Sequence, residues 1–328
     1  MSKIALVTGV AGFIGSHLAD KLLNLNYQVI GIDDLSNGKI ENINDFLNHP
    51  NFMFRESKIQ SADLEKIAPD CTHIFHLAGL ADIVPSINNP ENYFLANTYA
   101  TLKIMEYAKS KPIKKIVYAA SSSCYGANPA LPTAEDNVIK CEYPYALTKF
   151  QGEEIVQHFG KLFDIPHISL RLFNVYGPKS RTNGTYGAVM GVFLAQKIAG
   201  VPLTIVGNGE QKRDFVFIND VVNAFVLSAE SRLSDEIFNI GYGKPRSVNE
   251  LANLISKNQV NIPKRPGEPD TTWANISKAK DLLGWVPKTD LESGIEVILS
   301  QIDNWKSAPV WTPDKIEEAT KLWFRYLK

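Results

Sequence analysis

A tyrosine and a lysine stand four positions apart in a segment that has the pattern of a helix. The segment runs from Tyr143 to Gly160, and Pro144 is suited to its first helical position. A spacing of four places Tyr145 and Lys149 on one helical face, where the ammonium group favours the phenolate. Such a pair is typical of a phenol that takes a proton from an alcohol. Taken alone, it also fits a partly exposed aromatic ring beside a solvated lysine.

Three glycines follow the first apolar run of the chain at intervals of three. The run 4–7 suits a buried strand and 13–25 has helical spacing, so Gly9, Gly12 and Gly15 lie in a strand, turn and helix. Glycines at this spacing permit a tight turn, the approach of a pyrophosphate and close packing of helix on strand. Asp33 ends the next apolar run about twenty residues later, where a carboxylate can bind ribose hydroxyls. With no arginine directly after it, Asp33 favours NAD over NADP.

Alternating strand and helix patterns position these residues. The predicted strands of the first half span 27–32, 52–55, 73–79, 113–120 and 167–173, and its clearest helices span 97–108 and 143–160. This alternation predicts an α/β fold, a Rossmann-type doubly wound parallel sheet whose ligands sit outside the carboxyl ends of the strands. The second half has shorter elements, so we expect a smaller mixed α/β substrate lobe toward the C-terminus.

These patterns give an expected division of the chain. The predicted parts are an NAD-binding domain at 1–174 with parts of 214–245, a substrate lobe at 175–213 and 246–310, and a C-terminal helix at 311–328. That helix has Thr312 as its N-cap and Pro313 at its first position. Its apolar stripe is expected to dock on its own subunit.

Composition excludes several classes of protein. The chain has 328 residues, is 45% hydrophobic and has a formal net charge of −1, a balance that indicates neither a nucleic-acid nor a membrane partner. No apolar run approaches the roughly 20 residues of a membrane span, and the first strand leaves no room for a signal peptide. Cys71, Cys124 and Cys141 lack metal-type spacing and are predicted to be free thiols. We therefore expect a cytoplasmic protein without a metal site.

The motifs together resemble those of the extended short-chain dehydrogenase/reductases, and within them the nucleotide-sugar 4-epimerase branch. The resemblance runs from residue 3 to about 299 and leaves out 311–328. Its motifs are Gly9-x-x-Gly12-x-x-Gly15, Asp33, His76-Leu-Ala-Gly79, the serine run from Ser121 before Tyr125-Gly126, Tyr145-x-x-x-Lys149 and Arg171-x-x-Asn174-x-Tyr-Gly-Pro178.

This resemblance implies an NAD-dependent epimerase that works through a transient 4-keto sugar. Tyr145 takes the position of the base that removes the C4 hydroxyl proton, Ser121 shares the substrate oxygen, and Lys149 holds the nicotinamide ribose. The expected substrate is a UDP-hexose, a UDP-N-acetylhexosamine or a UDP-uronic acid. A homodimer is also implied, with the helices at 97–108 and 145–160 pairing across a two-fold axis.

The resemblance carries over two further sets of residues. The cofactor set is Gly9, Gly12, Phe13, Ile14, Gly15, Asp33, Asn37, Ile59, Leu77, Ala78, Asn97, Tyr145, Lys149 and Phe173. The substrate set is Ser86, Ser122, Asn174, Arg181, Arg213, Arg265, Glu268 and Thr272. The arginines suit a pyrophosphate because a guanidinium pairs two oxygens at once. Thr272 stands where related epimerases carry a bulky tyrosine, and it leaves room for a larger sugar substituent. Lys58 stands at a cofactor position where the family commonly carries an aspartate.

Rival activities of the same fold are separated by a few positions. Nucleotide-sugar dehydratases carry an Asp-Glu pair where this chain has Ser122 and Ser123, and a hydroxyl cannot replace a carboxylic acid as proton donor, so we exclude dehydration. A net C4 oxidoreductase on an NDP-sugar, GDP-linked sugars included, uses the same residues and stays open. A non-catalytic NAD-binding protein is the remaining alternative.

Overall fold

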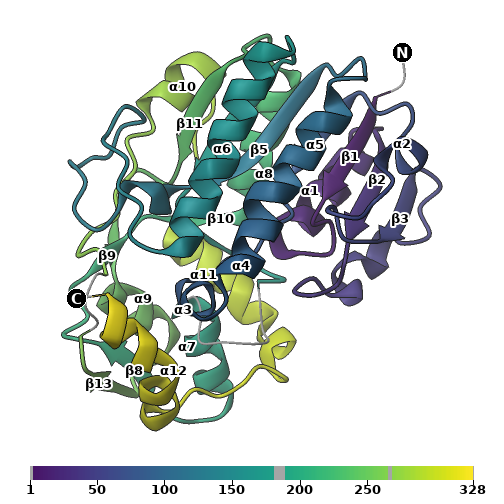
Figure 1. The fold of residues 1–328 in the computed structure, drawn as a ribbon. Helices are drawn as coiled ribbons and strands as arrows, with labels where there is room; N and C mark the ends of the chain where they lie inside the picture. Colours follow the sequence, from purple (N-terminus) through teal and green to yellow (C-terminus); the bar gives the residue numbers. More distant parts are fainter. Residues whose placement is uncertain (1–2, 181–188, 265–267, 328) are drawn as a thin grey trace.

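Seven parallel strands form one sheet at the centre of the part of the chain that the structure describes. This computed structural model describes residues 3–180, 189–264 and 268–327. Across the sheet (Figure 1) the order is β3 (Phe52–Glu56), β2 (Gln28–Asp33), β1 (Ile4–Thr8), β4 (His73–His76), β5 (Lys115–Ser121), β6 (His167–Leu172) and β11 (Glu236–Ile240). The chain order changes direction between β1 and β4, which confirms the predicted doubly wound sheet.

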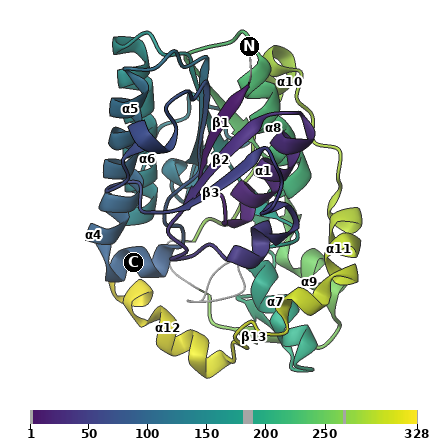
Figure 2. The same cartoon turned by 90° about the vertical axis from the view of Figure 1, so that its right-hand side faces the viewer.

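Helices cover both faces of the sheet (Figure 2). One face carries α1 (Phe13–Asn24) and α8 (Ile218–Glu230), and the other carries α2 (Leu64–Ile67), α5 (Ala100–Ala108) and α6 (Pro144–Leu162). Successive strand residues point to opposite faces, so each strand contributes side chains to the hydrophobic cores on both faces of the sheet. On β1, Ala5 and Val7 pack with α1 and α8, whereas Leu6 packs with α5 and α6.

The remaining elements form a second group with short paired strands. The pairs are β7 (Asn174–Tyr176) with β10 (Phe215–Phe217), β9 (Lys212–Arg213) with β12 (Arg246–Ser247), and β8 (Leu203–Val206) with β13 (Gln259–Ile262). The helices of this group are α7 (Val189–Ile198), α9 (Val248–Ile255), α10 (Ser277–Leu283), α11 (Leu291–Ser300) and η4 (Ile302–Trp305). Ser247 and Glu250 form a capping box that fixes the start of α9.

Several elements differ from the sequence prediction or were missed by it. The fourth strand ends at His76 instead of 79, and the helix expected at 97–108 begins earlier, as the π-helix η2 (Phe94–Tyr99). The sequence prediction missed the short helices α3 (Ile83–Asn88) and α4 (Pro90–Tyr93). The segments η1 (Ile40–Phe46) and η3 (Ser122–Tyr125) are irregular 3-10 helices. Helix α3 escaped detection because it is short and carries Pro85, which its first turn tolerates since no N–H partner is needed there.

The C-terminal helix α12 (Pro313–Tyr326) packs against α3 of the same chain (Figure 1). The Thr312 side chain caps its start, as predicted, and Ile316, Thr320 and Trp323 are buried. The predicted docking on its own subunit is confirmed. None of the helices in the described residues combines the length and apolar character that a membrane crossing needs.

Helix α6 lies close to β5 because Gly152 has no side chain. A Cβ at Gly152 would overlap the hydroxyl oxygen of Tyr118 and lie 3.0 Å from its Cζ. The Tyr118 hydroxyl instead donates a hydrogen bond of 3.2 Å to the carbonyl oxygen of Lys149. The glycine thus sets the distance between the sheet and the helical turn that carries Lys149.

We predict that Gly152→Ala destabilises the protein. Alanine is favoured over glycine in a helix by about 1 kcal/mol, but displacing the buried Tyr118 ring costs about 1–3 kcal/mol, so the clash outweighs propensity. Urea denaturation should give a lower free energy of unfolding, with Glu154→Ala, at an exposed site of the same turn, within about 0.5 kcal/mol of wild type. A more stable Gly152→Ala protein would contradict this account of the helix position.

Candidate active site

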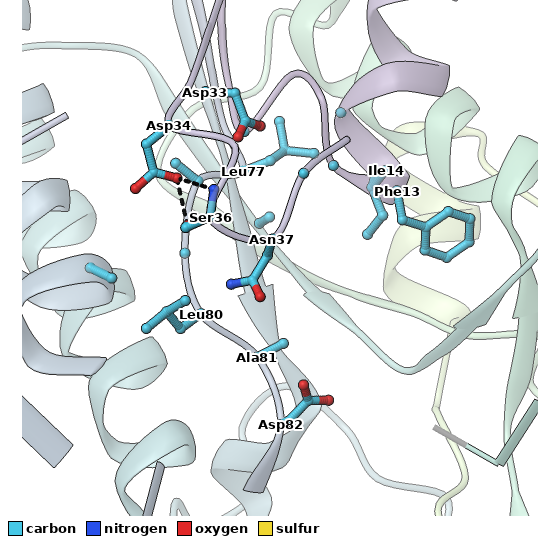
Figure 3. Close-up of a pocket in the computed structure, with 18 of the residues that line it drawn as sticks. Phe13, Ile14, Asp33, Asp34, Ser36, Asn37, Leu77, Leu80, Ala81 and Asp82 are labelled. Carbon is cyan, nitrogen blue, oxygen red and sulfur yellow. Dashed lines mark hydrogen bonds between the residues drawn. The ribbon is translucent and has the colours of Figure 1, made fainter. Parts of the chain in front are cut away.

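A cavity of about 410 Å³ opens where β1, β2 and β4 end (Figure 3). Parallel strands bring their carboxyl ends to one edge, which is why residues distant in sequence meet here. Ten predicted cofactor residues line it: Gly9, Gly12, Phe13, Ile14, Gly15, Asp33, Asn37, Ile59, Leu77 and Ala78. Lys58, where the motif departs from its usual aspartate, lines the cavity as well.

The glycine turn leaves no space for side chains. Gly9 has φ +71°, and a Cβ there would lie 2.9 Å from the Ala78 nitrogen. A Cβ on Gly15 would overlap the carbonyl oxygen of Gly9. The turn leads directly into α1, whose first N–H groups lack acceptors within the helix and offer the positive end of its dipole. This is a site for a phosphate group.

Asp33 ends β2 with its carboxylate held by backbone donors. Its Oδ2 accepts the Ala11 N–H and its Oδ1 accepts the Leu35 N–H, each at 2.9 Å. Burial raises its pKa, and these hydrogen bonds oppose the rise. Each carboxylate oxygen has a second lone pair, so the group can still accept from two ribose hydroxyls.

The loop after β4 is fixed by two buried side chains. Thr8 Oγ1 accepts the N–H groups of Leu77 at 3.1 Å and Ala78 at 3.0 Å. Asn97 accepts the Leu80 N–H at 2.8 Å and donates to the Leu80 carbonyl at 3.0 Å. Asn97, predicted as a cofactor contact, thus uses its amide to hold the loop that lines the cavity.

Tyr145 and Ser121 lie within hydrogen-bond distance across the end of β5. The Tyr145 hydroxyl donates to Ser121 Oγ at 3.2 Å, which joins the start of α6 to the last residue of β5. The Tyr145 ring stacks on Tyr143 and meets Tyr93 edge-on, each with 6.4 Å between ring centroids. Burial raises the pKa of Tyr145, and the Ser121 hydrogen bond opposes that rise. The phenol therefore needs a nearby cation to serve as a base at neutral pH.

Lys149 supplies a buried cation one turn along α6. Its side chain is 6% exposed, and its Nζ lies 4.3 Å from the centroid of the Tyr118 ring. A Cβ on Gly79, which lines the cavity, would be 3.8 Å from this Nζ. Burial lowers the pKa of Lys149 to about 7, and Glu153 opposes the shift. Within the described residues its ammonium makes no hydrogen bond or ion pair, only the contact with the Tyr118 ring face.

A buried ion pair lies one further turn along the same face of α6. Glu153 Oε2 accepts from Arg171 Nε at 2.9 Å and Oε1 accepts from Nη2 at 2.6 Å, while both residues are almost fully buried. Arg171 Nη1 also donates to the Tyr125 hydroxyl at 2.8 Å, which donates in turn to Asn239. Sequence reasoning missed Glu153, although its spacing of four from Lys149 was visible. The pair fastens α6 to β6 beneath the tyrosine and lysine.

Four predicted substrate residues lie together in the second group of elements. Thr272 Oγ1 donates to Asn174 Oδ1 at 2.9 Å, and it accepts the Asp214 N–H at 3.1 Å. Arg213 Nη1 donates to the Pro269 carbonyl, and its Nη2 lies 3.9 Å from Glu268. The cluster adjoins the cavity through Val175 and Tyr176, which follow Asn174 and line it.

The other predicted residues do not line the cavity or lie outside the described residues. Ser86 is buried on α3 and donates to the Ile83 carbonyl at 2.6 Å, while Ser122 is half-buried in η3. Phe173 is buried beside Tyr125. Arg181 and Arg265 lie outside the described residues. Burial raises the pKa of Cys124 to about 12, and all three cysteines are thiols.

Two cavity residues, Asp82 and Trp311, and the nearby Tyr93 escaped sequence reasoning because no motif marks them. Asp82 and Trp311 line the cavity, although one precedes α3 and the other precedes α12. The carbonyl of Trp311 accepts a hydrogen bond of 2.7 Å from the buried Gln196. Tyr93 donates from its hydroxyl to the carbonyl oxygen of Ala81, next to Asp82.

The residues present fit a dinucleotide such as NAD. A side chain at Gly9 or Gly15 would clash with the turn, which leads into the first N–H groups of α1, and the Asp33 carboxylate keeps acceptor capacity at one end of the cavity. The ammonium of Lys149 and the Tyr145 hydroxyl lie toward the ends of β4 and β5. The arrangement can bind a phosphate-linked nucleotide and remove a proton from an alcohol.

Comparison with known proteins agrees with this geometry. Residues 5–241 match the NAD dependent epimerase/dehydratase family. A UDP-glucose 4-epimerase of Mycolicibacterium smegmatis is 35% identical over 300 residues, which cover 88% of this chain and 95% of that protein.

Solved structures with the same fold include two further epimerases. The UDP-N-acetylglucosamine 4-epimerase of Methanobrevibacter ruminantium, in complex with UDP-N-acetylmuramic acid, has a TM-score of 0.85 and 36% identity. The UDP-glucuronic acid 4-epimerase of Bacillus cereus, in complex with UDP-glucuronic acid and NAD, has a TM-score of 0.86 and 32% identity. Each match covers 92% of this chain and 99% of the neighbour. The chain belongs to the NAD dependent epimerase/dehydratase family and, within it, to the nucleotide-sugar 4-epimerase branch.

Proposed function

We propose that this protein interconverts the C4 epimers of a UDP-linked hexose or hexose derivative, with NAD as its bound cofactor. The observation that carries the proposal is the Tyr145 hydroxyl, hydrogen-bonded to Ser121 and one turn from the buried ammonium of Lys149. The UDP portion is supported by the relatives, which share that nucleotide and differ in the sugar. Free thiols at all three cysteines fit a reducing cytoplasm.

The chain's own groups divide the work of the reaction. Tyr145 accepts the proton of the C4 hydroxyl, Ser121 holds the same oxygen, and Lys149 stabilises the phenolate by its charge. When bound, NAD supplies the reversible oxidation at C4 that no side chain can perform. We assign its pyrophosphate to the turn at Gly12 and the start of α1, and its adenosine ribose to Asp33.

The two groups of elements would hold the two ligands from opposite sides. We assign the cofactor to 1–174 with parts of 214–245, and the nucleotide sugar to 175–213 and 246–310. Asn174, Arg213 and Glu268 are proposed to bind the nucleotide diphosphate, since a guanidinium pairs phosphate oxygens in a planar fork. Thr272 is small, which leaves the 4-keto sugar room to present its opposite face before the proton returns.

We predict that the purified protein epimerises UDP-sugars at C4 without added NAD, because the oxidation is reversed in each turnover. Chromatography of UDP-glucose, UDP-N-acetylglucosamine and UDP-glucuronic acid reactions measures the product. Tyr145→Phe should lower kcat by about 10²- to 10⁴-fold, the usual contribution of a general base. Tyr143→Phe removes the hydroxyl of the stacked neighbour and serves as the matched control.

Each rival activity has its own outcome in this assay. A stoichiometric rise in NADH absorbance without an epimer selects the net C4 oxidoreductase, and GDP-sugars are included in the assay for that reason. Tight NAD binding without turnover on any sugar selects the non-catalytic protein. Either result contradicts the proposed epimerase.

We predict that Lys149→Met moves the pH of half-maximal kcat upward by about one unit or more. A neighbouring cation lowers the pKa of a phenol, so its removal raises the pH at which Tyr145 becomes a base. The pH profile of kcat measures the shift. Lys161→Met, at the exposed end of α6, should leave the profile unchanged. An unshifted profile for Lys149→Met would remove the lysine from the mechanism.

The same variant should be more stable than wild type at neutral pH. Burial lowers the pKa of Lys149 from 10.5 to about 7, so the unfolded chain binds this proton more tightly. The unfolding free energy therefore falls as pH drops from about 10.5 to about 7, and removing the lysine restores about 1 kcal/mol or more at pH 7. Urea denaturation at pH 7 and pH 10 measures the difference.

We further propose a homodimer that pairs η2, α5 and α6 with their copies. Phe94, Leu95 and Tyr99 are exposed apolar side chains on η2, and Leu147 is exposed on the adjacent α6. Exposed apolar side chains that adjoin on neighbouring helices favour burial against a second copy of the chain.

We predict a dimer in light scattering at micromolar concentration and a monomer for Leu147→Arg, which puts a charge into the proposed contact. Leu227→Arg changes an exposed leucine of α8, on the opposite face of the sheet, and should leave the dimer intact. A monomeric wild-type protein, or equal effects of the two changes, would contradict the proposed interface.

A further inference from the structure

The last part of the chain forms one wall of the cavity. Ala308, Pro309 and Trp311 line it, together with the strand ends and with Met190 and Val192 of α7. These residues lead into α12, and we call the continuous segment 308–326 the C-terminal strap. The strap lies beyond residue 299, where the family resemblance ends, and each solved neighbour matches over 99% of its own length but covers 92% of this chain. The family motifs therefore do not explain this wall.

The start of the strap is fastened to α7. Gln196, fully buried on α7, donates from Nε2 to the Trp311 carbonyl at 2.7 Å and to Thr204 Oγ1 at 2.9 Å. Its Oε1 accepts the Thr204 N–H at 3.1 Å, so both amide hydrogens and the amide oxygen are used and the side chain has one orientation. Ile316 is buried in the hydrophobic core to which α7 contributes. This end of the strap is thus joined to the α7 wall of the cavity.

The strap also packs on the opposite wall (Figure 1). Helix α12 contacts α3, which in turn contacts α6. Trp323 is buried about two turns beyond Ile316 and is not part of the core that holds Ile316. Helix α3 directly follows the loop of Leu80, Ala81 and Asp82, which lines the cavity (Figure 3). The strap therefore joins two cavity walls, α7 and the loop before α3.

Among the cavity walls that the structure describes, the strap opens at the lowest cost. The strand ends and the glycine turn belong to the central sheet, so moving them disrupts its ladder of hydrogen bonds. Helix α12 lies near the end of the chain and buries three of its 14 residues, Ile316, Thr320 and Trp323. Segments with few buried contacts open locally at a lower free energy than the whole fold. Undocking of α12 is thus the least costly way to open the cavity.

The proposed reaction needs a cavity that stays closed between its two halves. The 4-keto sugar is held by non-covalent contacts, and it must regain its two electrons and its proton before it leaves. If it left early, the electrons taken from C4 would remain on the cofactor as NADH and the proton would remain with the protein. Closure of a site prevents such losses of a reactive intermediate.

We infer that the C-terminal strap retains NAD and the 4-keto sugar by joining α7 to α3 across the cavity, and that its undocking limits their release. The inference rests on the proposed epimerase function for the sugar and on the fit of the cavity to a dinucleotide for NAD. Gln196 and Trp323 are positioning residues in this account, because they hold the strap and do not line the cavity.

The first test measures how fast NAD leaves the protein. Wild type, Trp323→Ala and Phe324→Ala are loaded with NAD and diluted, and the NAD that stays bound is followed over time. Trp323→Ala should release NAD about tenfold faster than wild type, since weakened contacts act mainly on dissociation rates. Phe324 is an exposed aromatic residue of the same helix, and Phe324→Ala should stay within about twofold of wild type. Equal release from all three proteins would overturn the inference.

A second arm follows the 4-keto sugar. With a UDP-sugar that wild type epimerises, Trp323→Ala should accumulate NADH absorbance and free 4-keto sugar, whereas a purely structural defect lowers turnover without either. No conversion of any sugar by wild type would overturn the epimerase proposal. The NAD release rates need no turnover and would still decide the role of the strap.

A third arm uses wild type alone, so it remains decisive if Trp323→Ala does not fold. Ligands that are released only from the undocked state stabilise the docked state. NAD and UDP together should therefore slow amide hydrogen exchange in α12 and α3 more than in α8, which does not line the cavity. Exchange in α12 that the ligands leave unchanged would contradict the proposed role of the strap.

Discussion

The burial of one ammonium group, that of Lys149, is the constraint on which this site depends. A lysine that is 6% exposed loses most of its hydration, and its only described contact is the face of the Tyr118 ring. A desolvated cation–π contact returns on the order of 2 kcal/mol, less than the hydration that is lost. The lowered pKa is the result. The charge is useful for the same reason that it is costly, since a poorly screened cation acts strongly on a neighbouring phenol.

The packing around α6 serves this buried charge. Gly152 brings the helix close enough for Tyr118 to lie under the ammonium, and the ion pair of Glu153 with Arg171 fastens the next turn to β6. Because Arg171 satisfies Glu153 through several hydrogen bonds, the carboxylate does not neutralise Lys149 directly. Tyr145, Lys149 and Glu153 repeat every four residues, so one helical face carries the base, the cation and the anchor. A shift of this helix along β5 would change all three together.

The sequence was informative where one residue type is forced by geometry. The glycine turn, Asp33 and the alternating apolar runs allowed the doubly wound parallel sheet to be predicted, because each depends on local spacing, while most of the ten cavity residues came from the family resemblance. The amide of Asn97 holds the loop at Leu80, a contact that no pattern encodes, and its assignment to the cofactor stays a prediction. Helix α3 and Asp82 were missed for a similar reason. Their positions are set by Tyr93 and α12, which approach only in the folded chain.

The two aspartates at the ends of the cavity show that the same group has different effects in different surroundings. Asp33 sits in an ordinary strand, where two backbone N–H groups stabilise its charge and orient it toward ribose hydroxyls. Asp82 has a positive φ, and its charge adds to the raised pKa of Tyr145. The backbone donors around Asp33 lower the pKa of that carboxyl, whereas Asp82 acts through its charge on a neighbouring side chain.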